Sequence, residues 1–213
     1  MEIQRTANAG VLLKLDGVSI LLDGLCNRIE PYMETPAPIV AEIMKNPPDL
    51  LAFTHGHSDH YGEALVSQFQ KQNLRPILGP ESLPYGTEHR KMQLGGVTIT
   101  PIPSRHIGKT EPGLSHCSYM IEGSKRIFFA GDAAPLQWKG REVKLDVLIA
   151  PYAYANTPAA WAWSQNVADQ VVLLHLPARD NDPAGLWEQV YQAVGTEAKS
   201  NLFIPQIGEN YTL

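Results

Sequence analysis

The chain has 213 residues, of which 44% are hydrophobic, 18% charged and 8% aromatic. A chain of this length can fold without a disulfide framework, and its two cysteines, Cys26 and Cys117, are too few to build one. The net charge of -5 and the lack of a Lys- or Arg-rich run argue against a nucleic-acid partner. There is no signal-peptide pattern at the start and no run of about 18 apolar residues that could span a membrane. We therefore expect one cytoplasmic domain over residues 1–213, with neither nucleic acid nor membrane as a partner.

The first third of the chain predicts a hairpin followed by alternating helices and strands. Two apolar runs, Val11–Leu15 and Val18–Leu22, flank Asp16-Gly17, which is typical of a two-residue type I′ turn. The expected elements that follow are a helix over residues 35–45, a strand covered on both faces over 49–54, a helix over 62–72 and a strand over 75–78.

The rest of the chain predicts two more hairpins and then parallel strands joined by helices. The hairpins are expected over residues 91–102 and 117–130, around Gly95-Gly96 and Gly123-Ser124. Strands are expected over 147–150 and 171–174, with a helix over 158–169 between them and a last helix from Asp182-Pro183 to Val194. This order predicts an α/β (α+β) domain with mixed sheets and helices on their outer faces.

Three of the seven histidines lie within six residues, in the sequence Thr54-His55-Gly56-His57-Ser58-Asp59-His60. A lone loop histidine is usually an ordinary surface residue, but three with an aspartate, directly after a buried strand, indicate a metal site. Imidazole and carboxylate together suit zinc, manganese or iron. The i, i+2 spacing lets His55 and His57 point the same way, while Asp59 and His60 turn to the other side. One loop can thus serve two metal ions.

Four residues cannot complete two coordination spheres, so further ligands are expected from other strand ends. His106, Asp132 and His175 each follow an apolar run, as His55 does. If these strands end at the same edge, their side chains meet the histidine cluster.

These residues resemble the metallo-β-lactamase superfamily over nearly the whole chain. The cluster matches its H-x-H-x-D-H signature, and the three later ligands follow in the expected order. Asp23 resembles the early aspartate that supports the ligand loop. The compact chain and its opening, residues 7–11, resemble small metal-dependent hydrolases related to bacterial ascorbate-lactone hydrolases. That branch often has Gly-His-Ala where this chain has Ala7-Asn8-Ala9, and Pro where it has Gly24.

The resemblance implies a four-layer αββα sandwich with a dinuclear site at one edge of its two sheets. It implies two divalent ions, zinc first and manganese or iron as alternatives, with Asp132 bridging them and Asp59 and Asp132 as catalytic residues. Two such ions lower the pKa of a bridging water and attract anionic substrates. The first ion would be held by His55, His57 and His106, and the second by Asp59, His60 and His175.

Four residues near these positions are candidate substrate contacts: His116, Arg105, Trp138 and Tyr152. His116 is equally consistent with a hydrogen-bonded residue at the start of a strand, and Arg105 can point away from the site. The aromatic run Tyr152, Tyr154, Trp161 and Trp163 can line the pocket or pack in the core, and Trp161 and Trp163 cannot both share one helix face. We expect His89 to be a surface residue.

The sequence therefore predicts a metal-dependent hydrolase that acts on a small, anionic ester, lactone or phosphodiester. One alternative is a mononuclear iron dioxygenase on the same fold, which would leave Asp59, His60 and His175 without a metal. Another is a metal-binding module without catalysis. Exposed aromatic residues would suit a homo-oligomer.

Overall fold

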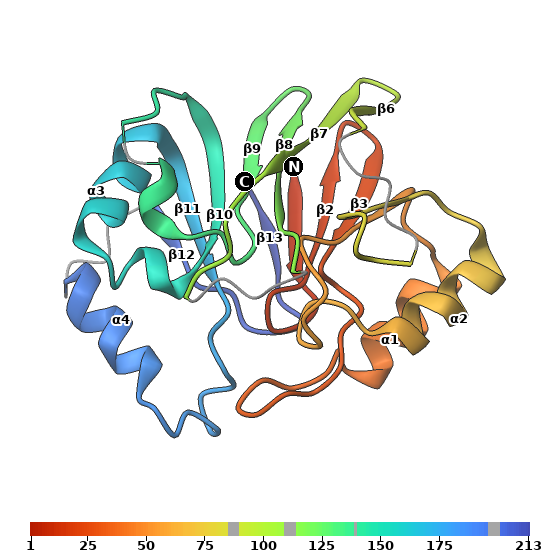
Figure 1. The fold of residues 1–213 in the computed structure, drawn as a ribbon, viewed down its shortest axis with the longest axis horizontal. Coiled ribbons are helices and arrows are strands. Elements are labelled where there is room, and N and C mark those ends of the chain that lie inside the picture. Colours follow the sequence, from red (N-terminus) through yellow and green to blue (C-terminus); the bar gives the residue numbers. More distant parts are fainter. Residues whose placement is uncertain (85–89, 109–113, 139, 196–200) are drawn as a thin grey trace.

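The computed structural model describes residues 1–84, 90–108, 114–138, 140–195 and 201–213. Within these ranges the strands form two sheets that pack face to face, with helices on both outer faces (Figure 1). This arrangement confirms the predicted four-layer αββα sandwich.

The first sheet carries helices α1 (Ala37–Lys45) and α2 (Glu63–Asn73) on its outer face, and α3 (Pro158–Val167) and α4 (Leu186–Val194) cover the second sheet. Along the first sheet the strands are β13 (Asn210–Thr212), β1 (Glu2–Arg5), β2 (Val11–Leu15), β3 (Val18–Leu22), β4 (Leu50–Ala52) and β5 (Ile77–Leu78). Along the second they are β12 (Leu202–Phe203), β11 (Ala168–Leu174), β10 (Leu145–Pro151), β9 (Arg126–Phe129), β8 (Cys117–Glu122), β7 (Val97–Pro103) and β6 (Met92–Leu94).

Buried apolar residues fill the space between each pair of layers. The central core joins the two sheets through residues such as Val11, Ile20, Ile127 and Ile149. Both faces of β4 are buried, as the continuous apolar run predicted. No helix in the described ranges is long and apolar enough to cross a bilayer.

Most predicted elements are confirmed, and two helix boundaries are wrong. In the first hairpin, Asp16 and Gly17 have φ values of 50° and 81°, as a type I′ turn requires. The helix predicted over 158–169 ends at Val167, because residues 168–174 form strand β11. The last helix begins at Leu186, and the Asp182 carboxylate accepts hydrogen bonds from the first backbone N–H groups of that helix instead of belonging to it.

Strand direction brings the ends of five strands to one edge. β3 and β4 are parallel in the first sheet, and β7, β9 and β11 run the same way in the second. Each of these strands is followed by one of the residues predicted for the metal site.

Candidate metal centre

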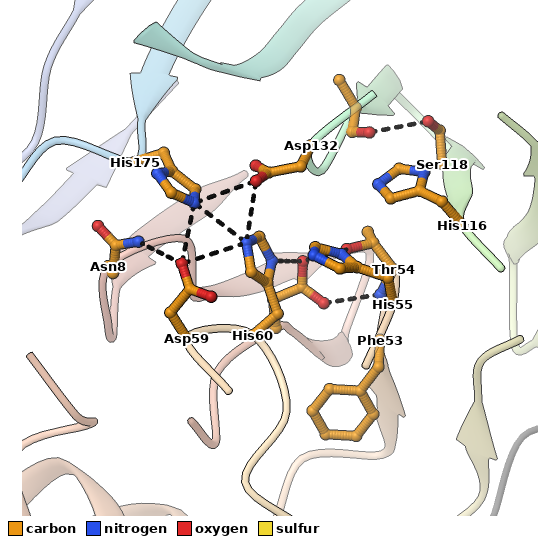
Figure 2. A network of polar contacts seen from close by, with 12 residues as sticks. Asn8, Phe53, Thr54, His55, Asp59, His60, His116, Ser118, Asp132 and His175 are labelled. Atoms are coloured by element: carbon orange, nitrogen blue, oxygen red, sulfur yellow. Dashed lines mark hydrogen bonds and ion pairs between the residues drawn. The ribbon is translucent and has the colours of Figure 1, made fainter. Parts of the chain in front are cut away.

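The predicted ligands meet at this edge, where the two sheets face each other. Figure 2 shows Asp59, His60 and the loop before them facing Asp132 and His175 from the opposite sheet. Ligand-type atoms within 4.8 Å of one another form three groups: His55, His57 and His106; His55, His60 and Asp132; Asp59, His60 and His175. The first and third groups have the membership expected for the two metal ions.

Asp132 lies between the first and third groups. Its Oδ2 atom is 3.2 Å from His175 Nε2, 3.5 Å from His60 Nε2 and 3.7 Å from His106 Nε2. One carboxylate therefore faces ligands from both groups, which is the position a bridging ligand needs.

Asp23 supports the ligand loop from behind. Its Oδ1 accepts the Thr54 backbone N–H at 2.7 Å, and its Oδ2 accepts the Thr54 hydroxyl at 2.7 Å and His60 Nδ1–H at 2.8 Å. Because the Thr54 hydroxyl proton is already donated, Thr54 Oγ1 accepts from His55 Nδ1–H, 3.0 Å away. In their neutral forms His55 and His60 then present the Nε2 lone pair, and such support fixes a metal-binding tautomer.

Several buried nitrogen and oxygen atoms form no hydrogen bond with the residues that the structure describes, and a metal ion could bind to them. His106 Nδ1 donates to the Ile107 carbonyl at 2.6 Å, so its Nε2 carries a lone pair. The Nε2 atoms of His55 and His106 and Oδ1 of Asp132 are buried and have no hydrogen-bond partner among the described residues. Unsatisfied buried polar atoms are costly, so this donor set fits divalent ions that prefer imidazole and carboxylate.

Without a metal ion, the third group and the neighbouring Asp132 carry charges. Burial disfavours a charged His175, but Asp132 and Asp59 outweigh burial and raise the pKa of His175 to about 9. Burial likewise opposes the charged form of Asp132, yet His175 and His60 hold its pKa well below the usual range. A metal ion entering this group would therefore replace a proton.

Two histidines of the first group, His55 and His106, are neutral instead. Burial lowers the pKa of His55 well below its ordinary value, and burial also lowers the pKa of His106. Both imidazoles are therefore available as neutral ligands.

His116 lies beside the first group with its own orientation fixed. Its ring centroid is 5.0 Å from that of His55 and 5.7 Å from that of His106. Ser118 Oγ donates to the Ala130 carbonyl at 2.8 Å, so Ser104 donates to Ser118 and accepts from His116 Nδ1–H at 2.7 Å.

This chain of hydrogen bonds leaves His116 Nε2 as a buried acceptor with no partner in the part of the chain that the structure describes. Burial lowers the pKa of His116 to about 3, so the ring is neutral.

A pair of tyrosines, Tyr32 and Tyr152, lies against His175 of the third group, and the sequence predicted only one of them. Tyr152, a predicted substrate contact at the end of β10, is hydrogen-bonded to Tyr32. The ring of Tyr32 contacts His175 edge-on, with centroids 4.5 Å apart, and Tyr152 is 6.5 Å from His175. Tyr32 lies in a loop without a local motif, so no sequence signal marked it.

Two other candidate substrate contacts, Trp138 and Arg105, are not members of the ligand groups. Trp138, expected to line the pocket, is 3% exposed and belongs to the core under α3, where its indole N–H donates to Tyr154 at 2.7 Å. Arg105 is exposed, and its backbone N–H and carbonyl are both bound by the side chain of Gln137. His89 lies outside the described residues.

Trp161 and Trp163 diverge on α3, as expected. Trp161 is buried in the core beneath the helix, and Trp163 is partly buried, with its indole N–H donating to the Arg141 carbonyl at 3.1 Å.

Curated relatives of the chain are metal-dependent hydrolases. No family model matches the chain. A UPF0173 metal-dependent hydrolase of Methanopyrus kandleri is 25% identical over 149 residues, covering 62% of this chain and 62% of that protein. Another, from Enterococcus faecalis, is 29% identical over 126 residues, covering 49% of this chain and 55% of that protein. The chain thus covers less than two thirds of the length of either relative.

Solved structures share the fold along almost the whole chain. A possible metal-dependent hydrolase from Veillonella parvula has a TM-score of 0.76 at 15% identity, covering 100% of this chain and 99% of that one. The metallo-β-lactamase fold protein YhfI from Bacillus subtilis has a TM-score of 0.62 at 15% identity, covering 99% and 98%. CmlA, a diiron β-hydroxylase from Streptomyces venezuelae, has a TM-score of 0.65 at 13% identity, covering 100% of this chain and 54% of that one. The fold is therefore the metallo-β-lactamase fold, as the sequence resemblance predicted.

Proposed function

We propose that this protein is a hydrolase that uses two divalent metal ions, zinc first, to cleave a small ester, lactone or phosphodiester. The observation that carries the proposal is the position of Asp132, whose Oδ2 faces His106 of one ligand group and His175 of the other. The curated relatives, named metal-dependent hydrolases, support the same reaction class.

His55, His57 and His106 would hold one ion, Asp59, His60 and His175 the other, and Asp132 both. Bound there, two divalent ions supply a hydroxide nucleophile at neutral pH and polarise the substrate oxygen. Asp59 is 6% exposed and lies at the edge of the group, where its carboxylate can orient the nucleophile and hold its proton.

One side of the site offers a hydrogen-bond donor, and the opposite side offers a hydrogen-bond acceptor. The hydroxyls of Tyr32 and Tyr152 share one hydrogen bond, so one of their two protons is left for an oxyanion of the substrate. His116 Nε2, on the other side, is only an acceptor. With two cations in the site, an anionic small molecule is the expected substrate.

Metal analysis of the purified protein, followed by a screen of lactones, thioesters and phosphodiesters, tests the proposal. We expect two equivalents of a transition metal and turnover of at least one of these classes. Folded protein that binds no zinc, manganese or iron, and stays inactive when they are added, would refute it.

The iron dioxygenase alternative has one observation in its favour, the similarity in fold to a diiron β-hydroxylase. In its mononuclear form it gives no role to Asp59, His60 and His175, which lie together as a third ligand group. A non-catalytic metal-binding module likewise gives no role to the tyrosine pair. Iron-specific absorption with oxygen consumption would favour the dioxygenase.

A further inference from the structure

The N-terminal segment contacts the third ligand group from outside the histidine loop. Residues 5–8 connect β1 to the turn before β2, and Asn8 lies beside Asp59 in Figure 2. Neither Arg5 nor Asn8 belongs to any of the three ligand groups. Both are nevertheless buried, with 2% of each residue exposed.

His175 needs external support because its backbone is strained. Its φ is 64°, a left-handed conformation that costs a non-glycine residue about 1–3 kcal/mol and persists only where neighbours enforce it. This conformation turns the side chain back toward Asp59 and Asp132, whose Oδ2 atoms lie 3.1 Å and 3.2 Å from His175 Nε2.

Arg5 and Asn8 hold the backbone on both sides of this strained residue. The Asn8 carbonyl accepts the His175 backbone N–H at 3.2 Å. Arg5 Nη2 donates to that same carbonyl at 3.0 Å and to the Leu176 carbonyl at 2.6 Å. Arg5 Nη2 therefore links the carbonyl of Leu176, the residue after His175, to the Asn8 carbonyl, which accepts the backbone N–H of His175.

The rest of the Arg5 guanidinium is fixed in the same manner. Its Nε donates to the Ala7 carbonyl at 3.1 Å, and its Nη1 donates to the Pro205 carbonyl at 2.9 Å. Among the described residues, no carboxylate forms a salt bridge with Arg5. A buried cation bound only by backbone carbonyls fixes the course of the chain and contributes no ion pair.

The Asn8 side chain reaches the other acidic ligand. Its Nδ2 donates to Asp59 Oδ2 at 3.4 Å, and its buried Oδ1 accepts no hydrogen bond from the residues that the structure describes. Asn8 thus contacts His175 through its backbone and Asp59 through its side chain, which are two of the three members of this group.

We propose that Arg5 and Asn8 are positioning residues that set the metal affinity of the group formed by Asp59, His60 and His175, without binding the metal themselves. The inference rests on the proposed dinuclear site. It gives a role to Asn8, which stands where the branch resembled by the sequence often has histidine. Residues that orient metal ligands in this way typically change metal affinity by about 10–100-fold when they are removed.

Zinc titration of metal-free protein by calorimetry, with metal content by mass spectrometry, tests the proposal. The variants are Asn8→Leu, which keeps the branched four-atom shape of the side chain but loses the amide, and Arg5→Lys, which keeps the charge but loses the planar set of N–H donors. We expect two zinc equivalents in the wild type, and in both variants a second equivalent weakened about 10–100-fold with the first unchanged. His175→Ala identifies which equivalent belongs to this group.

Gln4→Ala is the matched control, because Gln4 is adjacent to Arg5. Among the described residues, its side chain forms one hydrogen bond, which Nε2 donates to the Gly208 carbonyl at 3.4 Å. It should bind zinc like the wild type. If Arg5→Lys fails to fold, Asn8→Leu decides alone. Wild-type affinity for the second equivalent in Asn8→Leu, or equal weakening of both equivalents, overturns the inference. A wild type that binds one equivalent also overturns it, and a wild type that binds none refutes the proposed function itself.

Discussion

At the scale of single residues, the carboxylate of Asp59 is held by three side chains. Its Oδ2 atom is 3.1 Å from His175 Nε2, 3.4 Å from Asn8 Nδ2 and 3.8 Å from His60 Nε2. The side chain is nearly buried, and burial opposes its charge, but the hydrogen bond from His175 and the nearby histidines lower its pKa. Asp59 is therefore an ionised carboxylate at the position where a nucleophile would be oriented.

Replacing this carboxylate should abolish activity while leaving the fold intact. We expect Asp59→Ala to lower kcat by about 100- to 10,000-fold, the usual contribution of a positioned acid or base. The measurement is turnover of the substrate found by the screen, with circular dichroism to verify the fold. Asp146→Ala, which removes a surface aspartate paired with Lys125, should keep full activity. Full activity in Asp59→Ala would contradict the assigned role.

The pKa of His175 predicts how the stability of the metal-free protein depends on pH. The folded protein holds the His175 proton up to a pKa of about 9, against an ordinary value of 6.5. The resulting stabilisation, roughly 3 kcal/mol at 1.36 kcal/mol per pKa unit, is fully present below pH 6.5 and is lost as pH rises through about 9.

Thermal unfolding of metal-free protein across this pH range checks the prediction. Tm should fall from pH 6.5 to 9, and Asp132→Asn should flatten the profile because Asp132 contributes most to keeping the proton. A Tm that stays constant or rises over this range would argue against a protonated His175.

Residue spacing predicted which side chains lie together better than it predicted what surrounds them. The histidine loop and the strand-end residues His106, Asp132 and His175 all lie in the candidate ligand groups. Trp138 lies in the core, because closeness in sequence to Asp132 does not fix the direction of a side chain. Tyr32 and Asn8 reach the site through tertiary contacts that leave no local pattern.

At the scale of elements, strand ends and the turns after them build the site. Gly131, between β9 and Asp132, has a φ of 56°, and a Cβ there would lie 2.4 Å from Thr54 Cγ2. The turn thus allows Asp132 to approach the ligand loop of the opposite sheet. Any side chain at this position would push the two sheets apart at the metal site.

Gly131→Ala should therefore be more damaging than an ordinary glycine substitution. The control is Gly17→Ala, with a φ of 81° but nothing within 4 Å of a new Cβ. Backbone strain alone should cost Gly17→Ala about 1–2 kcal/mol, and Gly131→Ala should exceed this because the clash with Thr54 adds to the strain. Urea unfolding measures the free energy of unfolding of both variants. Equal losses of stability would contradict the prediction, because they would show that Thr54 moves away from the new Cβ at little cost.

Three short strands, two of them at sheet edges, were beyond the reach of the sequence patterns. β1, β12 and β13 have four, two and three residues, too few to establish an alternation. The pairing of β1 with β13 joins residues from opposite ends of the chain, since Ile3 lies opposite Tyr211. The longer hairpins carried their own turn signals and were predicted correctly.

At the scale of the whole molecule, the order of hairpins first and βαβ-like units later predicted mixed sheets with helices on their outer faces, and the family resemblance predicted the four layers. The single-domain interpretation over residues 1–213 stays a prediction. Metal removal has a global consequence here, because the ligands come from both sheets and the folded state alone assembles them.

Zinc should stabilise the folded protein, and chelation should reverse this. At a free zinc concentration about 100 times Kd, one site contributes about 2.7 kcal/mol. For a chain of this size each kcal/mol shifts Tm by roughly 2–4 °C. Differential scanning calorimetry with and without a chelator measures the shift. His55→Ala should reduce it, and a Tm that does not respond to zinc would contradict a metal site between the sheets.

The division of ligands between the two sheets has a consequence for how reactivity can change. His55, His57, Asp59 and His60 move with the first sheet, whereas His106, Asp132 and His175 move with the second. The geometry of each ligand group is therefore set by how the sheets sit on one another, because each group draws side chains from both sheets. Close-packed interiors transmit small displacements, and a shift of about 1 Å can change a rate about 100-fold. Volume changes at central-core residues such as Ile20 or Ile149 should thus tune the rate from a distance, an evolutionary route that leaves every ligand in place.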